Sequence, residues 1–168
     1  LGVDIDLNSE FDEIRKNLED NATADYIASR GEYLNAKLIA AYLGYDFVDS
    51  KKMIRFDEKG RFMEDLTNRE IAKELANHVI PGFYGLKVDG TIKTFSRGGS
   101  DITGALVARA VEADVYENWT DVSGFLMADP RIVKDPKPIS SISYKELREL
   151  SYMGASVLHE DAIYPARV

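Results

Sequence analysis

The segment Thr94–Ala105, with the sequence TFSRGGSDITGA, places two glycines between an arginine and a Ser-Asp pair. A strand is predicted before it, because Asp89-Gly90 is a strong hairpin signal, and a helix is predicted from Ser100 onward. Ser100 or Asp101 is therefore expected to cap the helix. The glycines let successive N–H groups point the same way, and the helix dipole adds partial positive charge there. The segment is either a capped surface loop or a cradle for an anion.

The charged residues of this segment suggest what such a cradle would do. Arg97 can bind a carboxylate or a phosphate through two parallel hydrogen bonds. Asp101 would then lie beside the bound anion, which is unfavourable unless its carboxylate orients a nucleophile, a cation or a metal-bound phosphate. Phosphoryl transfer uses this combination of positioned donors and an organising carboxylate. On these residues alone, the capped loop remains an equal alternative.

The composition indicates a soluble globular protein with a single domain. The chain has 168 residues, of which 45% are hydrophobic and 30% charged. Its formal net charge of −8 argues against general binding to nucleic acids or anionic membranes, which requires a basic face. Cysteine is absent, and His78 and His159 stand far apart beside apolar residues, so no metal site is predicted. No apolar run approaches the length of a membrane span. The absence of cysteine is compatible with a reducing, cytosolic setting, and we expect a cytoplasmic location.

Predicted helices and strands alternate along the chain. Helices are expected from Ser9, over Thr23–Leu43 with Gly44 as the stop, over 67–76 after a Thr-x-x-Glu capping box, from Ser100, after a second capping box at Ser143, and over the last segment up to Pro165. Strands are expected within 45–50, 53–56, 78–86 and 114–120. This alternation predicts an α/β fold, a three-layer α/β/α sandwich with a mainly parallel sheet, plus a β-hairpin flap. No linker divides residues 1–168.

Two further clusters are candidates for ligand contacts. Thr120 and Asp121 follow a predicted strand, where ligands bind in many α/β folds. Arg131 follows an Asp-Pro corner and could reach a nucleotide phosphate, or it could be a solvated arginine on an ordered loop.

Two glycine-flanked positions are also candidates, although each has a plain structural interpretation. Glu32 follows Gly31 within a predicted helix, where it could simply be a solvated acid beside a packing glycine. Phe83 lies between two glycines, either in an ordinary turn or where the backbone approaches a ligand.

Four segments, taken in order, resemble the catalytic domain of aspartate kinase, a member of the amino acid kinase superfamily. They are SRGEYLNAKLIAAYL, VIPGFYG, TFSRGGSDITGALVARAVEADVYENWTDVSGFLMADPRIV and SYKELRELSYMGASVLHEDAIYPA. The resemblance covers nearly the whole chain. It implies transfer of the γ-phosphoryl group of ATP, with Mg²⁺, to the side-chain carboxylate of L-aspartate, which is the first step toward lysine, threonine and methionine.

The resemblance also assigns roles to individual residues. Arg97 would bind the α-carboxylate of aspartate and Glu32 its α-ammonium group, while Asp101 would organise the reacting groups. The backbone of Phe83 and the Gly99-Ser100 turn would complete the substrate pocket. The expected ATP-binding residues are Thr120, Asp121, Leu126, Arg131 and Ser156; the family often has Tyr and Lys at the positions of Leu126 and Ser156.

Parts of the family pattern have no counterpart in this sequence. The opening strand with Lys-Phe-Gly-Gly-Thr-Ser and the C-terminal regulatory ACT domains are missing, so we expect a fragment of a longer homo-oligomeric enzyme with little activity by itself. Two alternatives remain. One is another kinase of the superfamily, with glutamate, acetylglutamate or a nucleotide as acceptor. The other is a non-catalytic binding or dimerisation module.

Overall fold

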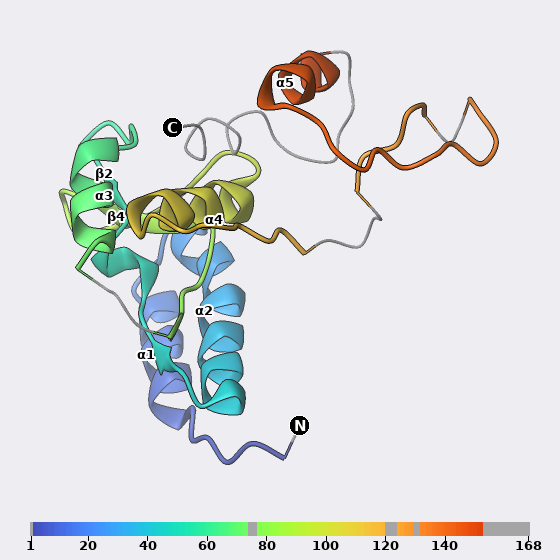
Figure 1. The fold of residues 1–168 in the computed structure, drawn as a ribbon. Coiled ribbons are helices and arrows are strands. Elements are labelled where there is room, and N and C mark those ends of the chain that lie inside the picture. The colour runs from blue at the N-terminus through green and yellow to red at the C-terminus, as the bar shows by residue number, and fades with distance from the viewer. Residues whose placement is uncertain (1, 74–76, 120–123, 130–131, 153–168) are drawn as a thin grey trace.

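The computed structural model describes residues 2–73, 77–119, 124–129 and 132–152 (Figure 1). Its elements, in chain order, are α1 (Asn8–Glu19), α2 (Ala24–Leu43), β1 (Asp46–Phe47), the 3₁₀ helix η1 (Ser50–Lys52), β2 (Arg55–Phe56), α3 (Glu64–Ile71), β3 (His78–Val79), β4 (Tyr84–Lys87), β5 (Ile92–Thr94), α4 (Gly99–Ala110) and α5 (Tyr144–Tyr152). No helix within these ranges is long and apolar enough to cross a membrane.

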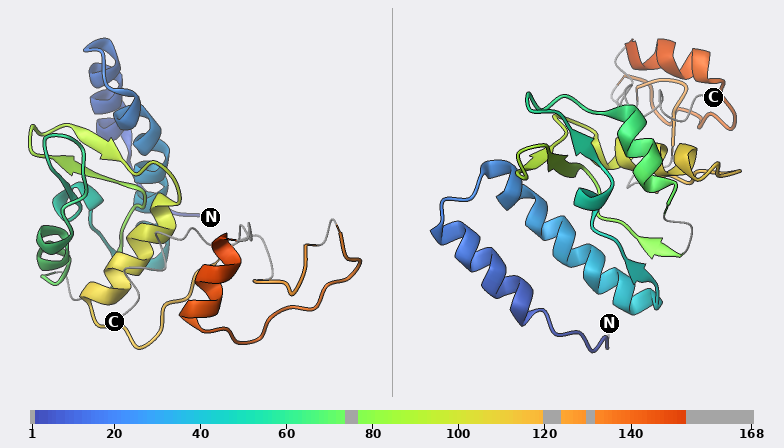
Figure 2. Two further views of the ribbon diagram at one scale, coloured as in Figure 1. Left: turned by 90° about the horizontal axis from the view of Figure 1, so that it is seen from above. Right: turned by 90° about the vertical axis from the view of Figure 1, so that its left-hand side faces the viewer.

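The strands form two small sheets. β1 and β3 pair in parallel, while β2 pairs in parallel with β4, which pairs antiparallel with β5. Helix α2 contacts β1, β3 and β5, whereas α3 contacts β2 and α4, so the strands lie between two pairs of helices (Figure 2). This arrangement confirms the predicted α/β fold class, with helices on both sides of parallel and mixed sheets.

Helix α4 is anchored in the hydrophobic core. Its Ile102 and Leu106 are buried together with Ile71 of α3, and with Val48 and Met53 from the segment between β1 and β2. The aromatic rings of Phe56, Phe62 and Phe95 pack beside this core at centroid separations of 5.1–6.1 Å. The turn between β5 and α4 therefore begins and ends on packed structure.

Several local predictions are confirmed. The Oγ1 of Thr23 accepts a hydrogen bond from the backbone N–H of Tyr26, and Gly44 ends α2 in the left-handed conformation. Gly90 has a φ of 83° in the β4–β5 hairpin. The Ser143 hydroxyl and the carboxylate of Glu146 form the predicted capping box at the start of α5.

Other local predictions are wrong, in one case because a contact distant in sequence overrides the local signal. The Thr67 capping box does not start a helix: α3 begins at Glu64, and the buried Thr67 hydroxyl accepts the backbone N–H of Arg55 at 3.0 Å. Helix α1 begins at Asn8 rather than after a Ser9 cap. The predicted strand 78–86 divides into β3 and β4, which belong to different sheets.

Two further predictions concern the strand expected from residue 114 and the helix expected at the C-terminus. Residues 114–119 form no strand, although a strand was predicted there. The predicted C-terminal helix over 156–165 lies outside the described residues.

Candidate functional site

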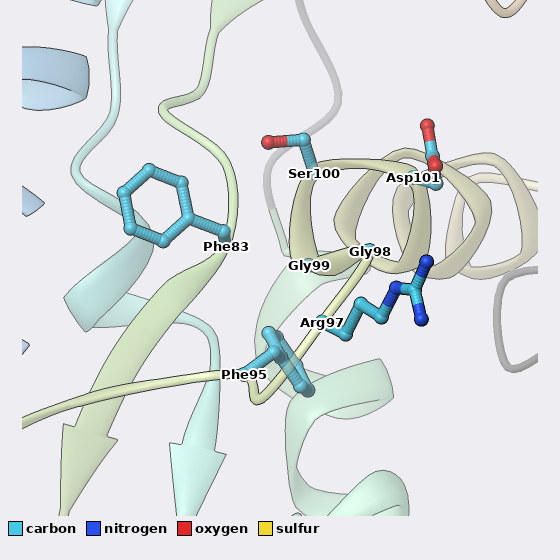
Figure 3. Close-up of a pocket in the computed structure, with 7 residues that line it drawn as sticks. All are labelled: Phe83, Phe95, Arg97, Gly98, Gly99, Ser100 and Asp101. Atoms are coloured by element: carbon cyan, nitrogen blue, oxygen red, sulfur yellow. The ribbon is translucent and has the colours of Figure 1, made fainter. Parts of the chain in front are cut away.

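A pocket of about 320 Å³ opens at the start of α4 (Figure 3). It is lined by Phe83, Phe95, Arg97, Gly98, Gly99, Ser100 and Asp101. Five of the predicted site residues are thus brought together by two turns, one preceding β4 and the other joining β5 to α4.

The start of α4 differs from the predicted cap. Gly98 is the N-cap residue and adopts the left-handed conformation with φ 59°, which glycine tolerates without steric cost. The prediction that Ser100 or Asp101 caps the helix is wrong, since both lie within its first turn and no side chain caps α4. The first N–H groups of a helix have no partner inside the helix, and here they border a pocket. This geometry suits an anion.

Arg97 and Asp101 bring opposite charges to the pocket. Arg97 is exposed and makes no ion pair or hydrogen bond with another described residue. Its guanidinium lies on the Asp101 side of the first turn of α4, while the Ser100 hydroxyl extends toward Phe83 (Figure 3). The partly buried Asp101 accepts a hydrogen bond of 3.1 Å from the Asn118 side-chain amide.

The segment after α4 folds back along the helix. Tyr116 packs against Gly104, and burial raises the pKa of the Tyr116 hydroxyl, with a further contribution from the negative charge of Asp101. The sequence does not predict the contact of Asn118 with Asp101, because the pattern of this segment favours a strand. Asn118 had no local signal that could have identified it.

Phe83 forms the opposite wall of the pocket under conformational strain. Its φ is 59°, which is uncommon for a residue with a side chain. Its N–H donates to the Thr103 Oγ1 at 3.1 Å, and its carbonyl accepts from Phe95 N–H at 2.9 Å. The backbone of Phe83 was expected to complete the substrate pocket, and both its N–H and its carbonyl are already bonded within the protein.

Glu32 of α2 does not line this pocket, but its side chain is hydrogen-bonded to the turn before β4, which contributes Phe83 to the lining. Its Oε1 accepts a hydrogen bond from the Gly82 N–H at 3.2 Å. Gly82 packs so closely on Ser100 that an added Cβ would lie 2.9 Å from the Ser100 Oγ. The Glu32 carboxylate is therefore held at the Ser100 side of the pocket. By contrast, an added Cβ at Gly31 would meet nothing within 4 Å, so that glycine is not required for packing.

Most of the predicted ATP-binding residues lie outside the described residues. They are Thr120, Asp121, Arg131 and Ser156. Leu126 is described, is partly buried and forms an isolated β-bridge with Pro138. Within the described ranges, no group of three or more His, Asp or Glu residues could hold a metal ion.

Comparisons with known proteins agree with this arrangement. A family model described as the amino acid kinase family matches residues 4–168. Aspartokinase 3 of Bacillus subtilis (strain 168) is 43% identical over 153 residues, which is 84% of this chain and 34% of that protein. The chain spans about a third of the length of the curated relatives it matches.

Solved structures give the same result. Aspartate kinase from Clostridium acetobutylicum aligns with a TM-score of 0.89 and 54% identity, over 99% of this chain and 38% of that one. Aspartokinase III from E. coli, in complex with aspartate and ADP, aligns with a TM-score of 0.79 and 30% identity, over 95% of this chain and 42% of that one. The resemblance to aspartate kinases is confirmed, and the chain belongs to the amino acid kinase family.

Proposed function

We propose that this chain provides the amino acid site of an aspartokinase, which transfers the γ-phosphoryl group of ATP to the side-chain carboxylate of L-aspartate. The observation that carries the proposal is the pocket at the start of α4, where Arg97 and an uncapped helix terminus border the same space. The complex of the E. coli relative with aspartate and ADP supports it.

The polar groups around the pocket match an amino acid with two carboxylates. Arg97 binds the α-carboxylate through charge-assisted hydrogen bonds. The N–H groups of Gly99 and Ser100 at the start of α4 add further donors. Glu32, held on the Gly82 N–H, keeps a second carboxylate oxygen for the α-ammonium group.

Asp101 organises the reacting groups. Near the side-chain carboxylate of the substrate, its carboxylate would contribute to holding the Mg²⁺ that accompanies ATP, and that cation would offset the negative charge of the phosphoryl group. ATP supplies that phosphoryl group, and we assign its binding to Thr120, Asp121, Leu126, Arg131 and Ser156. We further propose that residues 1–168 belong to one catalytic domain of a cytoplasmic homo-oligomer that serves lysine, threonine and methionine synthesis.

The test is a comparison of acceptors with the whole protein. Release of ADP is measured with aspartate, glutamate, acetylglutamate and a nucleoside monophosphate, and the acyl phosphate is trapped as a hydroxamate. We expect turnover with aspartate alone. Turnover with a different acceptor, or no binding of aspartate by calorimetry, contradicts the proposal.

The variant Arg97→Ala tests the binding role. It should raise the KM for aspartate about 10- to 100-fold, because hydrogen bonds to a charged group are lost, and change the KM for ATP little. Arg61→Ala is the matched control, since Arg61 is exposed and pairs with Asp57 away from the pocket. An equal effect of both substitutions on the KM for aspartate would rule out a specific role for Arg97.

A further inference from the structure

The Thr103 side chain joins the two turns that build the pocket. Its hydroxyl donates to the carbonyl of Gly99 at 2.7 Å and accepts from the Phe83 N–H at 3.1 Å. Thr103 is only 4% exposed. The hydroxyl therefore uses one bond to hold the first turn of α4 and another to hold the turn before β4.

The two bonds differ in what they require. Threonine hydroxyls in helices often donate to the carbonyl four residues earlier, so the bond to Gly99 is a local feature. The bond from Phe83 crosses 20 residues of sequence and depends on how α4 and the turn before β4 are placed relative to each other. It satisfies an N–H group of a residue with φ 59°, a conformation that surrounding contacts must hold in place.

The two turns lie so close together that their relative position can change little. A Cβ added to Gly99 would lie 2.6 Å from the Phe83 Cβ and 2.8 Å from its Cα. The two backbones are therefore in direct contact. The Phe95 N–H bonds the Phe83 carbonyl on one side of this contact, and the Thr103 hydroxyl bonds the Phe83 N–H and the Gly99 carbonyl on the other. Both turns line the pocket, so a shift between them changes its shape.

We propose that Thr103 is a positioning residue that sets the affinity of this pocket for its amino acid substrate. The inference rests on the proposed function. Thr103 does not line the pocket; it acts through Phe83 and through the N–H groups at the start of α4.

A second threonine provides a matched control. Thr67 of α3 is fully buried, and its hydroxyl accepts the backbone N–H of Arg55 at 3.0 Å, so it also serves an N–H distant in sequence. It does not contribute to the lining of the pocket at α4. Thr67→Val and Thr103→Val therefore remove the same chemical group at similar burial, and only the second is coupled to the site.

The experiment measures the KM values for aspartate and ATP, kcat and the thermal midpoint of the whole protein. Thr103→Val should raise the KM for aspartate about tenfold and leave the KM for ATP within about twofold, because the Phe83 N–H loses its acceptor and the turn moves. Thr103→Ser keeps the hydroxyl and should restore the wild-type KM. Thr67→Val should lower the thermal midpoint while the KM for aspartate stays at the wild-type value.

A second readout does not depend on the substrate. Amide hydrogen exchange at Phe83 should become about tenfold faster in Thr103→Val and stay at the wild-type rate in Thr103→Ser and Thr67→Val. If Thr103→Val does not fold, Thr103→Cys, whose sulfur is a weak acceptor, should give the same changes at smaller size.

The two proposals fail in different ways. An unchanged KM for aspartate in Thr103→Val overturns the positioning role, whatever the exchange at Phe83, and so does an equal rise of that KM in Thr67→Val. A wild-type protein that phosphorylates no aspartate overturns the proposed function instead, and in that case exchange at Phe83 still decides whether the Thr103 hydroxyl holds the turn before β4.

Discussion

The two ends of β5 carry glycine-containing turns that differ in how their polar groups are satisfied. In the hairpin turn, the Asp89 carboxylate accepts hydrogen bonds from the Lys87 ammonium and from the hydroxyl and backbone N–H of Thr91, at 2.6–2.9 Å. In the turn before α4, no side chain caps the helix, and Arg97 has no hydrogen-bond or ion-pair partner within the described residues.

This difference separates a structural turn from a binding turn. Polar groups in folded proteins bond either to protein or to water. At the turn before α4 the Arg97 guanidinium and the first N–H groups of the helix border one pocket, so an anion that enters it can replace water as their partner. At the hairpin turn, the Asp89 carboxylate is bonded by groups of the same turn, so this turn should matter only for stability. The turn at Arg97 should matter mainly for the substrate.

The largest expected effect is at Asp101, because we assign it to the reacting groups. Asp101→Asn keeps the size of the side chain and removes its charge, and should lower kcat about 100- to 1,000-fold in the whole protein, measured by ADP release. Asp114→Asn is the control, since Asp114 is an exposed acid beyond the end of α4. A kcat for Asp101→Asn within about tenfold of the wild-type value would remove Asp101 from the reaction.

The second largest effect is expected at Gly99, where the turn before α4 contacts the turn before β4. An alanine at Gly99 would bring its Cβ 2.6 Å from the Phe83 Cβ and 3.0 Å from the Phe95 Cβ, so the backbone must shift. Gly99→Ala should lower the free energy of unfolding by about 1–3 kcal/mol, measured in urea, and raise the KM for aspartate.

Gly31→Ala is the matched control for this substitution. Its added Cβ would meet nothing within 4 Å, and Gly31 lies inside α2. The free energy of unfolding should rise by up to about 1 kcal/mol, because alanine has the higher helix propensity. Loss of stability in both variants would mean that close packing is not what makes Gly99 necessary.

The sequence was informative where structure is local. The bounds of α2 follow from Thr23 and Gly44, and the pocket could be predicted at Arg97–Asp101 because its parts are neighbours in the chain. Such signals depend on the backbone of a single turn, which the nearest residues determine.

The sequence was misleading or silent where a side chain serves a distant segment. Thr67 has the pattern of a helix cap, yet its hydroxyl bonds the Arg55 N–H, 12 residues away. Thr103 and Asn118 gave no signal, because their partners Phe83 and Asp101 lie 20 and 17 residues away in sequence. Tertiary packing alone creates these contacts.

The smallest effect is expected at the hairpin turn that contains Asp89. The Lys87 ammonium, followed by the hydroxyl and N–H of Thr91, holds the pKa of the Asp89 carboxyl well below its usual value of 3.8. Because the pKa is lower in the folded state, the stabilising contribution of Asp89 is complete above about pH 4 and is lost as the pH falls through the folded value. This carboxylate is exposed to solvent, so the contribution is small.

Asp89→Asn should therefore lower the thermal midpoint slightly at neutral pH. Its difference from the wild-type midpoint should stay constant above about pH 5 and narrow as the pH falls below about 4, because the Asp89 carboxylate of the unfolded chain then binds a proton while that of the folded protein keeps its charge to lower pH. The KM for aspartate should not change, because Asp89 lies at the opposite end of β5 from the pocket. A midpoint difference that is constant with pH would show that the charge of Asp89 does not stabilise the hairpin. A raised KM for aspartate would show that the two turns are coupled through β5, and the division between a structural turn and a binding turn would then be wrong.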